Sequence, residues 1–519
     1  MNRYIKLIFT ATILVMVTSC DNEEFFELTN PPQAPWQSLL DLEKAPIGAY
    51  YGLTGNGGNR CIFTVGRMAA EVFADGANVA AAADGFNVNS DIEDMYNRSQ
   101  VGTQVAVFDN NIYNSGYFAV GFANGALDFI TGAENNNPFP GAGRPDEVAR
   151  IQGELHFVRA YAYYWLARLY LPAYPSDEKR IPFRISQATN FDEAVTSELA
   201  SANDIYALIV SDLQAAKDLL PERFEAGLHN ASYEDGRANK FAAAALLAKV
   251  HFHMGNHTDA LAELNFVIDQ NGGDYDLSED PIEAWNKTGI ARGKEVIWYY
   301  TLWAGDGLGG SSNWKHPGRF SWYSGGTRDS EDPSKNGGRF VVASEDLLQA
   351  AGWMNADGSE NPAALNDKRY SQLFIRYDAG ADSRSSFNTS KPYVWGHKYY
   401  RSGVRRSTNL PMLRLADMYL LRATINASTS SFVPARADLN MIRNRAGIGD
   451  FAGADADLMD AIELERRIEL AFEGDRLYYL QGLKKDIPNG DRGAGSIPYT
   501  SNFYSEVPQY ELDLNTAFQ

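Results

Sequence analysis

The chain has 519 residues, and its 46 Lys and Arg against 66 Asp and Glu give a formal net charge of −20. Such an acidic protein repels phosphate backbones, which excludes nucleic acid as a partner. A chain of this length can bury a large hydrophobic core, and with only two cysteines the fold must rest on that core.

The N-terminus has the features of an export signal: Arg3 and Lys6, an apolar run over residues 7–17, and then small residues. The run is shorter than the ~20 residues that a membrane-spanning helix needs. Residues 17–20, VTSC, resemble a bacterial lipobox, in which cleavage leaves the cysteine as an acylated N-terminus. We therefore expect a signal peptide at 1–19 and a mature chain at 20–519, anchored by palmitate-type acyl chains on Cys20. An ordinary secreted protein is the alternative.

Apolar residues recur at three- and four-residue steps over 151–169 and again over 205–220, where Pro221 forbids continuation. These spacings predict two helices that pack together. Further along, 237–273 predicts a helix, a break at Gly255 and a second helix, which resembles a tetratricopeptide unit.

Residues 410–448 show the same helix, turn, helix layout, with a longer loop at 427–434. We predict a mostly α fold in which tetratricopeptide-like helix pairs form a scaffold, mainly at 145–270 and 405–485, with long loop-rich insertions and a few short strands.

Two regions, about 54–115 and 271–400, lose this periodicity and are rich in Gly, Asp, Ser and aromatic residues. Within the second, KEVIWYYTLW at 294–303 alternates as a short strand. Loops held by a rigid scaffold commonly carry function, so we expect ligand-binding regions here.

Six segments in this order make the chain similar to the SusD/RagB family of outer-membrane lipoproteins. They are the lipobox at Cys20, GELHFVRAYAYYWLARLY at 153–170, GRANKFAAAALLAKVHFHMGN at 236–256, LPMLRLADMYLLRATIN at 410–426, LNMIRNRAGI at 439–448 and ERRIELAFEGDRLYYL at 465–480. The resemblance implies a tetratricopeptide-based body that captures nutrients, usually glycans, at the cell surface and forms a lid on a SusC-like TonB-dependent transporter. The acids after Cys20 resemble the signal that sends lipoproteins to the outer cell surface in Bacteroidetes-type bacteria, and a flexible, solvated tether is the alternative. The ligand residues of the family lie in variable loops, so none is carried over.

The densest charge cluster is Glu465, Arg466, Arg467, Glu469, Glu473 and Arg476. Carboxylates four residues apart share a helical face, as an acid and base pair for glycoside hydrolysis would. The interleaved arginines lower carboxyl pKa values, whereas a general acid needs a raised pKa. We predict an ion-pair network that fixes the last helices and no catalytic residue.

Metal and cofactor sites are not favoured either. Of His251, His253 and His257, only the last two could converge on a zinc ion, and they do so across Gly255, where the helix ends. The acidic stretch NGGDYDLSED at 271–280 contains ligands for Ca²⁺ without the EF-hand spacing. We therefore expect no metal and no cofactor.

Aromatic side chains give the preferred binding hypothesis, because flat rings stack on the C–H faces of a sugar. Trp298 and Tyr300 share one side of the predicted strand and are assigned to the core. The candidate ligand contacts in the second loop-rich region are Trp303, Trp314, Trp322 and Tyr323, with Trp353 and Trp395 in reserve. In the first loop-rich region they are Arg67, Asp75, Asn78, Phe86 and Tyr96.

The sequence thus predicts a non-enzymatic, lipid-anchored outer-membrane protein facing the cell exterior, which binds oligosaccharide and delivers it to a SusC-like transporter. Two alternatives stay open: a peptide-binding protein of the same uptake system, and a surface glycoside hydrolase.

Overall fold

The computed structural model describes residues 36–54, 62–80, 90–98, 112–285, 291–301, 341–378, 380–381, 388–398, 409–501 and 505–519. The chain divides into two compact units, 1–42 and 43–519. In the first, the backbone N–H of Asp41 donates to Ser38 Oγ (3.1 Å) at the start of helix α3 (Leu39–Leu42).

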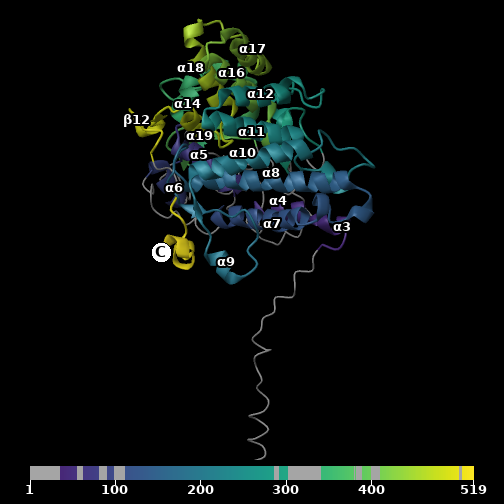
Figure 1. The fold of residues 1–519 in the computed structure, drawn as a ribbon. Helices are drawn as coiled ribbons and strands as arrows, with labels where there is room; N and C mark the ends of the chain where they lie inside the picture. Colours follow the sequence, from purple (N-terminus) through teal and green to yellow (C-terminus); the bar gives the residue numbers. More distant parts are fainter. Residues whose placement is uncertain are drawn as a thin grey trace, which may run out of the picture. The chain divides into compact units, whose positions relative to one another are not determined.

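Among the described residues of the second unit, nine helices form a stack in which each helix packs against the next (Figure 1). In order of contact they are α4 (Lys44–Gly52), α7 (Tyr113–Thr131), α8 (Pro145–Tyr170), α10 (Ala202–Leu219), α11 (Lys240–Met254), α12 (His257–Asp269), α16 (Leu415–Ser428), α17 (Phe432–Arg445) and α18 (Leu458–Glu469). Such stacking of helix pairs buries one continuous core. The mostly α, tetratricopeptide-like fold expected from the sequence is confirmed.

The ends of these helices follow local chemistry. α10 begins with a capping box, in which Ser201 Oγ accepts from the backbone N–H of Asp204 and the Asp204 carboxylate accepts from Ser201. It ends before Pro221, as predicted. α11 ends at Gly255, whose φ of +80° is the left-handed conformation that glycine adopts at little cost.

α7 is not indicated by the periodicity of the sequence, because glycines interrupt its apolar pattern. The close packing of the helix explains one of them: a Cβ added at Gly116 would lie 2.7 Å from the side chain of Leu166 on α8. Gly52 on α4 plays the same role, since its Cβ would lie 2.7 Å from the backbone N of Ala119. Small residues thus let α4, α7 and α8 approach closely.

In the part of the chain that the structure describes, six antiparallel strand pairs connect the remaining segments. They are β1 (Ala77–Val79) with β5 (Val341–Ala343), β4 (Val296–Tyr300) with β10 (Leu410–Arg414), β6 (Phe374–Tyr377) with β9 (Tyr393–Gly396), β2 (Ile181–Pro182) with β3 (Leu199–Ala200), β7 (Gly380–Ala381) with β8 (Asn388–Thr389), and β11 (Ile487–Pro488) with β12 (Ser496–Ile497). The predicted strand at β4 is confirmed, with Trp298 in the core.

The helix expected from Leu410 begins instead at Leu415, because residues 410–414 pair with β4 as strand β10. The loop expected at 427–434 is also shorter, since α16 and α17 are separated only by residues 429–431. Short helices complete the unit: α5 (Arg67–Phe73), α6 (Ser90–Asn97), α9 (Phe191–Val195), α14 (Glu345–Ala350), α15 (Lys368–Leu373), α19 (Arg476–Gly482) and α20 (Gln509–Leu514).

Candidate functional site

Two strand pairs fix both ends of the segment 302–340, which contains four of the candidate aromatic residues. The chain leaves the described structure after β4, which is paired with β10, and returns at β5, which is paired with β1. In the second pair Asn78 lies opposite Val342. The two loop-rich regions predicted from the sequence therefore meet at the β1–β5 pair.

Several sequence candidates lie outside the described residues: Trp303, Trp314, Trp322, Tyr323, Phe86 and the lipidation site Cys20. Their roles stay predictions. The other four candidates, on α5, β1, α6 and the α5–β1 connection, can be placed.

Arg67 and Asp75 are buried and bound to protein partners. The Arg67 guanidinium donates to the backbone carbonyls of Glu473 (2.7 Å) and Pro411 (3.0 Å). The Asp75 carboxylate accepts from Arg476 at 2.6 and 2.9 Å. Burial disfavours ionisation of Asp75, but the guanidinium of Arg476 outweighs it and lowers the pKa of Asp75. In this structure both side chains attach the α5–β1 segment to the C-terminal helices.

Asn78 and Tyr96 remain partly exposed beside the same junction. Asn78 Nδ2 donates to the carboxylate of Asp491 at 2.6 Å. The guanidinium of Arg492 lies 4.0 Å from the centre of the Tyr96 ring, a cation–π contact that fixes the ring. Of the four placed candidates, these two have side-chain surface at which a ligand can bind.

The reserve candidates Trp353 and Trp395 are each only 2% exposed. The Trp353 ring packs against Tyr370 and Phe374, and the Trp395 ring against Tyr377 and Tyr393. These contacts place both indoles in the core of the 341–398 insertion. Aromatic side chains are well suited to such a core because each buries a large apolar area.

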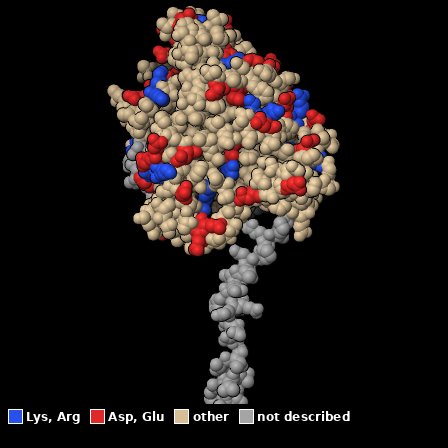
Figure 2. Space-filling view, viewed as in Figure 1, with Lys and Arg blue, Asp and Glu red and all other residues tan. Residues whose placement is uncertain are grey.

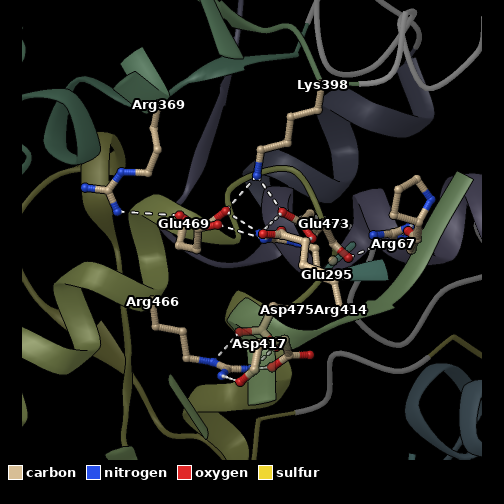
Figure 3. Close-up of polar contacts among 12 residues, drawn as sticks. Arg67, Glu295, Arg369, Lys398, Arg414, Asp417, Arg466, Glu469, Glu473 and Asp475 are labelled. Carbon is tan, nitrogen blue, oxygen red and sulfur yellow. Dashed lines mark hydrogen bonds and ion pairs between the residues drawn. The ribbon is translucent and has the colours of Figure 1, made fainter. Parts of the chain in front are cut away.

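The charge cluster predicted at the end of α18 forms a buried network (Figure 3). Arg414 at the end of β10 donates to the carboxylates of Glu295 (2.9 Å), Glu469 (2.7 Å) and Glu473 (2.7 Å). Lys398 Nζ donates to the backbone carbonyl of Glu469 at 2.8 Å. These groups come from four separate segments, so the network joins the insertion to the helix stack.

Ion pairing determines the ionisation of these carboxyls. Burial opposes the charge of Glu469, but the guanidiniums of Arg445, Arg414 and Arg369 outweigh burial and hold its pKa below the usual range. The pKa of Glu473 is lowered in the same way, by Arg414 and Lys398 against burial. A general acid needs a raised pKa, so these groups are suited to structural pairing. The ion-pair interpretation is confirmed.

A second group of charges lies below the first in Figure 3. Arg466 donates to Asp417 (2.5 Å) and Asp475 (2.7 Å), and Lys249 of α11 pairs with the same two carboxylates. These contacts tie α11, α16, α18 and the start of α19 together. Isolated buried charges would be very costly, and mutual pairing removes most of that cost.

Glu71 differs from its acidic neighbours because no cation pairs with it in the ion pairs of the described residues. Its carboxylate accepts from the backbone N–H groups of Gly474 (2.9 Å) and Asp475 (3.4 Å). Burial, only partly offset by the Gly474 N–H, raises the pKa of Glu71 to about 7.

His253 and the acidic stretch at 271–280 have structural partners. His253 lies between the rings of Tyr164 and Tyr478, and burial together with nearby cations lowers its pKa to about 3. The carboxylates of Asp274 and Asp280 pair with Arg223 and Lys368. Within the described residues, no group of three or more His, Cys, Asp or Glu could hold a metal ion. In the same part of the chain, no helix has the length and apolar character of a membrane span.

Sequence reasoning missed several members of the Glu469 network, namely Glu295, Arg369, Lys398, Arg414 and Arg445. The sequence does contain a weak indication of two of them, because Glu295 and Arg414 are charged residues at the ends of the apolar strands β4 and β10. A charge beside a buried strand requires a partner, which the sequence does not identify.

Comparison with known proteins adds to this geometry. Residues 65–252 match the family described as "Starch-binding associating with outer membrane", and residues 276–481 match the SusD family. SusD-like protein P2 of Formosa agariphila is 24% identical over 545 residues, which cover 99% of this chain and 98% of that protein. SusD-like protein P25 of the same organism is 27% identical over 510 residues, covering 90% and 88%.

Solved structures show the same fold. A SusD superfamily protein from Bacteroides thetaiotaomicron superimposes with a TM-score of 0.70 at 19% identity, covering 92% of this chain and 99% of that one. A structure described as a laminarin-binding SusD-like protein superimposes with a TM-score of 0.67 at 20% identity, covering 92% and 97%. The fold, the two consecutive family matches and the relatives aligned over almost the whole length agree: this chain belongs to the SusD/RagB family.

Proposed function

We propose that this protein is a non-catalytic, lipid-anchored surface protein that binds a neutral oligosaccharide and passes it to a SusC-like TonB-dependent transporter. Family membership and the family description, which associates these proteins with the outer membrane, support this role. The observation that carries the proposal is the β1–β5 pair, which brings the first loop-rich region beside the end of the tryptophan-rich segment.

Charge supports a neutral ligand. On the face drawn in Figure 2, acidic and basic side chains are interspersed among a larger uncharged surface. With a formal charge of −20 the whole chain repels anionic polymers at long range. Uncharged sugars are free of this repulsion, and rings with hydroxyl-binding groups are sufficient to hold them.

Affinity electrophoresis of the full-length chain in a detergent without sugar headgroups tests the binding. Gels containing laminarin or starch, among other neutral polysaccharides, should retard the wild-type protein. Trp314→Ala and Trp322→Ala should each weaken retention by roughly tenfold, the equivalent of one lost stacking contact. Phe191→Ala is the matched control, because Phe191 is 70% exposed on α9, outside both loop-rich regions.

Each outcome separates the candidate functions. Unchanged retention in both tryptophan variants would reject these residues as the binding site. Capture of oligopeptides without saccharide binding would favour the peptide-binding alternative, and release of reducing sugar by the wild-type protein would establish a hydrolase.

The anchor and the partner have their own test. Cys20→Ala should release the protein from the membrane fraction, because the acyl chains supply the membrane affinity. Copurification of a TonB-dependent channel with the wild-type protein from native membranes would support the delivery step, and its absence would contradict it.

A further inference from the structure

A cavity is lined by segments other than β1 and β5. It has a volume of about 380 Å³ and opens between the α10–α11 connection at 220–239, the turn after α12 at 271–276, and residues 292–299 leading into β4. This volume is within the range of ~300–1,000 Å³ found for small-molecule sites.

Three tyrosine rings form its buried wall, and hydrogen bonds hold each of them in place. Tyr233 donates to the backbone carbonyl of Ala238 at 2.8 Å, and the Tyr275 hydroxyl accepts from Asn239 Nδ2 at 2.7 Å. The Tyr299 hydroxyl donates to the Asp235 carboxylate at 3.0 Å. Because the rings are already ordered, a ligand that contacts them does not have to immobilise them.

Charged groups of both signs line the rest of the cavity in equal number: Glu222, Glu234, Asp274, Arg223, Arg237 and Arg292. Arg237 is already paired, with Glu154 and Glu43. The lining therefore carries no net charge, which disfavours an anionic ligand. It offers donors and acceptors side by side, the pattern that sugar hydroxyls, which both donate and accept, are able to satisfy.

Two arginines at the opening are held in position for such contacts. The Arg292 guanidinium lies 4.5 Å from the centre of the Tyr275 ring and donates to the carbonyls of Val296 (3.0 Å) and Asp274 (3.2 Å). Arg223 Nε lies 3.3 Å from Asp274 Oδ2, and that oxygen accepts no hydrogen bond from any described residue. The carboxylate is ion-paired and partly exposed, and its remaining lone pairs can accept from a ligand hydroxyl.

We propose that this cavity is a second saccharide subsite, which takes one or two neutral sugar units of a bound glycan. The inference rests on the proposed glycan-binding function and adds to it a site built entirely from described residues. Its ligand groups are the arginine pair, Asp274 Oδ2 and the tyrosine wall.

The test compares Arg223→Ala/Arg292→Ala with wild type, using full-length protein in the laminarin and starch gels. The double variant should bind roughly fivefold more weakly or worse, since each charged hydrogen bond to a ligand is lost. Arg436→Ala is the matched control: Arg436 also lies over a ring, that of Phe451 at 5.2 Å, and donates to two backbone carbonyls, but on α17. Melting temperatures of both variants equal to that of the wild type would confirm that folding is unaffected.

Hydrogen–deuterium exchange locates the contact independently of any substitution. Adding the retained polysaccharide to the wild-type protein should slow exchange in peptides covering 222–239 and 271–276, and leave α17 unchanged.

The outcomes distinguish this proposal from the main one. Wild-type retention with unchanged binding by the double variant, or without protection of the two segments, would overturn the subsite and leave the proposed function intact. If none of the polysaccharides retains the wild-type protein, the proposed function fails, and the subsite fails with it.

Discussion

Between α16, α17 and α18 lies a cluster of buried apolar side chains, whereas the side chains buried at the end of α18 are charged. Ala416, Leu420, Leu439 and Ile462 are each 0% exposed and contact one another within one cluster. About two turns beyond that cluster, Glu469 is 2% exposed and is surrounded by guanidiniums. The apolar contacts join helices that are neighbours in sequence, while the charged contacts around Glu469 join β4, β10 and the 341–398 insertion to the stack.

The comparison shows how this fold accepts large insertions. Helix pairs need only shape and hydrophobicity, which many sequences supply. An insertion has to be attached at one place on the stack. Buried charges fix that place because each of them requires a specific partner. We infer that the two regions respond differently to substitution and to pH.

Removing the central carboxylate should have the largest effect. Glu469→Ala leaves Arg414 and Arg445 buried without this partner, so we expect a loss of about 3–5 kcal/mol in the free energy of unfolding at pH 7. Urea unfolding measures it. The control is Glu345→Ala, whose partner is Lys391 in a pair that is 46% exposed on both sides, and which should change stability by about 0.5 kcal/mol or less. Equal losses in the two variants would contradict the comparison.

The same experiment has a pH signature. Because the pKa of folded Glu469 is lowered from 4.5, its contribution is present above that value and is lost as the pH falls through the folded pKa. The difference between Glu469→Ala and wild type should therefore shrink below pH 4.5.

The contribution of Glu71 to stability should depend on pH in the opposite direction. Its folded pKa of about 7 exceeds the ordinary 4.5, so the folded state binds a proton that the unfolded state has lost, and stability falls as the pH rises between these values. Glu71→Gln keeps an acceptor for the Gly474 N–H and removes the buried charge. We expect a gain on the order of 3 kcal/mol at pH 8 and none at pH 4. Thermal unfolding at the two pH values checks it, and a loss at pH 8 would refute the assignment.

Substitution in the helix stack should have a smaller effect that does not depend on pH. Gly116→Ala places a methyl group against Leu166, and we expect a loss of about 1–3 kcal/mol from overpacking. Gly121→Ala in the same helix is the control, since its Cβ meets no atom within 4 Å. That variant should gain about 0.5–1 kcal/mol from helix propensity. A gain in both variants would show that α7 and α8 separate easily.

The smallest effect is expected at a helix end. Ser201→Ala removes the capping box of α10 and should cost about 1 kcal/mol. Ser428→Ala removes only a hydroxyl that donates to the Ile425 carbonyl within α16, and should be nearly neutral. Denaturant midpoints of the two variants and wild type measure the difference, and equal midpoints would argue against the cap.

The same contrast explains what the sequence could predict. α8, α10, α11 and α12 follow from apolar spacing and local stop signals, because both depend on residues a few positions apart. Glycines conceal α7 in the sequence, and the reason for one of them, Gly116, is contact with Leu166 on another helix. β10 was read as helix because a five-residue apolar run fits either structure until its partner β4 is known.

The candidate site was harder to predict. Arg67 and Asp75 were chosen as polar residues in a loop-rich region, and the structure shows them bound to partners near residue 475. Such pairs, some 400 positions apart, leave no trace in local spacing. The loop-rich composition of the two regions indicates where the candidate site lies. It does not indicate which residue each charged side chain pairs with.

The paired strands at both ends of 302–340 also bear on how the length and sequence of this segment can vary. When the two ends of a segment are fixed, doubling its length costs only about 0.6 kcal/mol in closure entropy. Residues can therefore be inserted, deleted or exchanged between β4 and β5 while the anchoring strands keep their register. Sequence changes in this stretch can accumulate without disturbing the strand pairs that hold its ends.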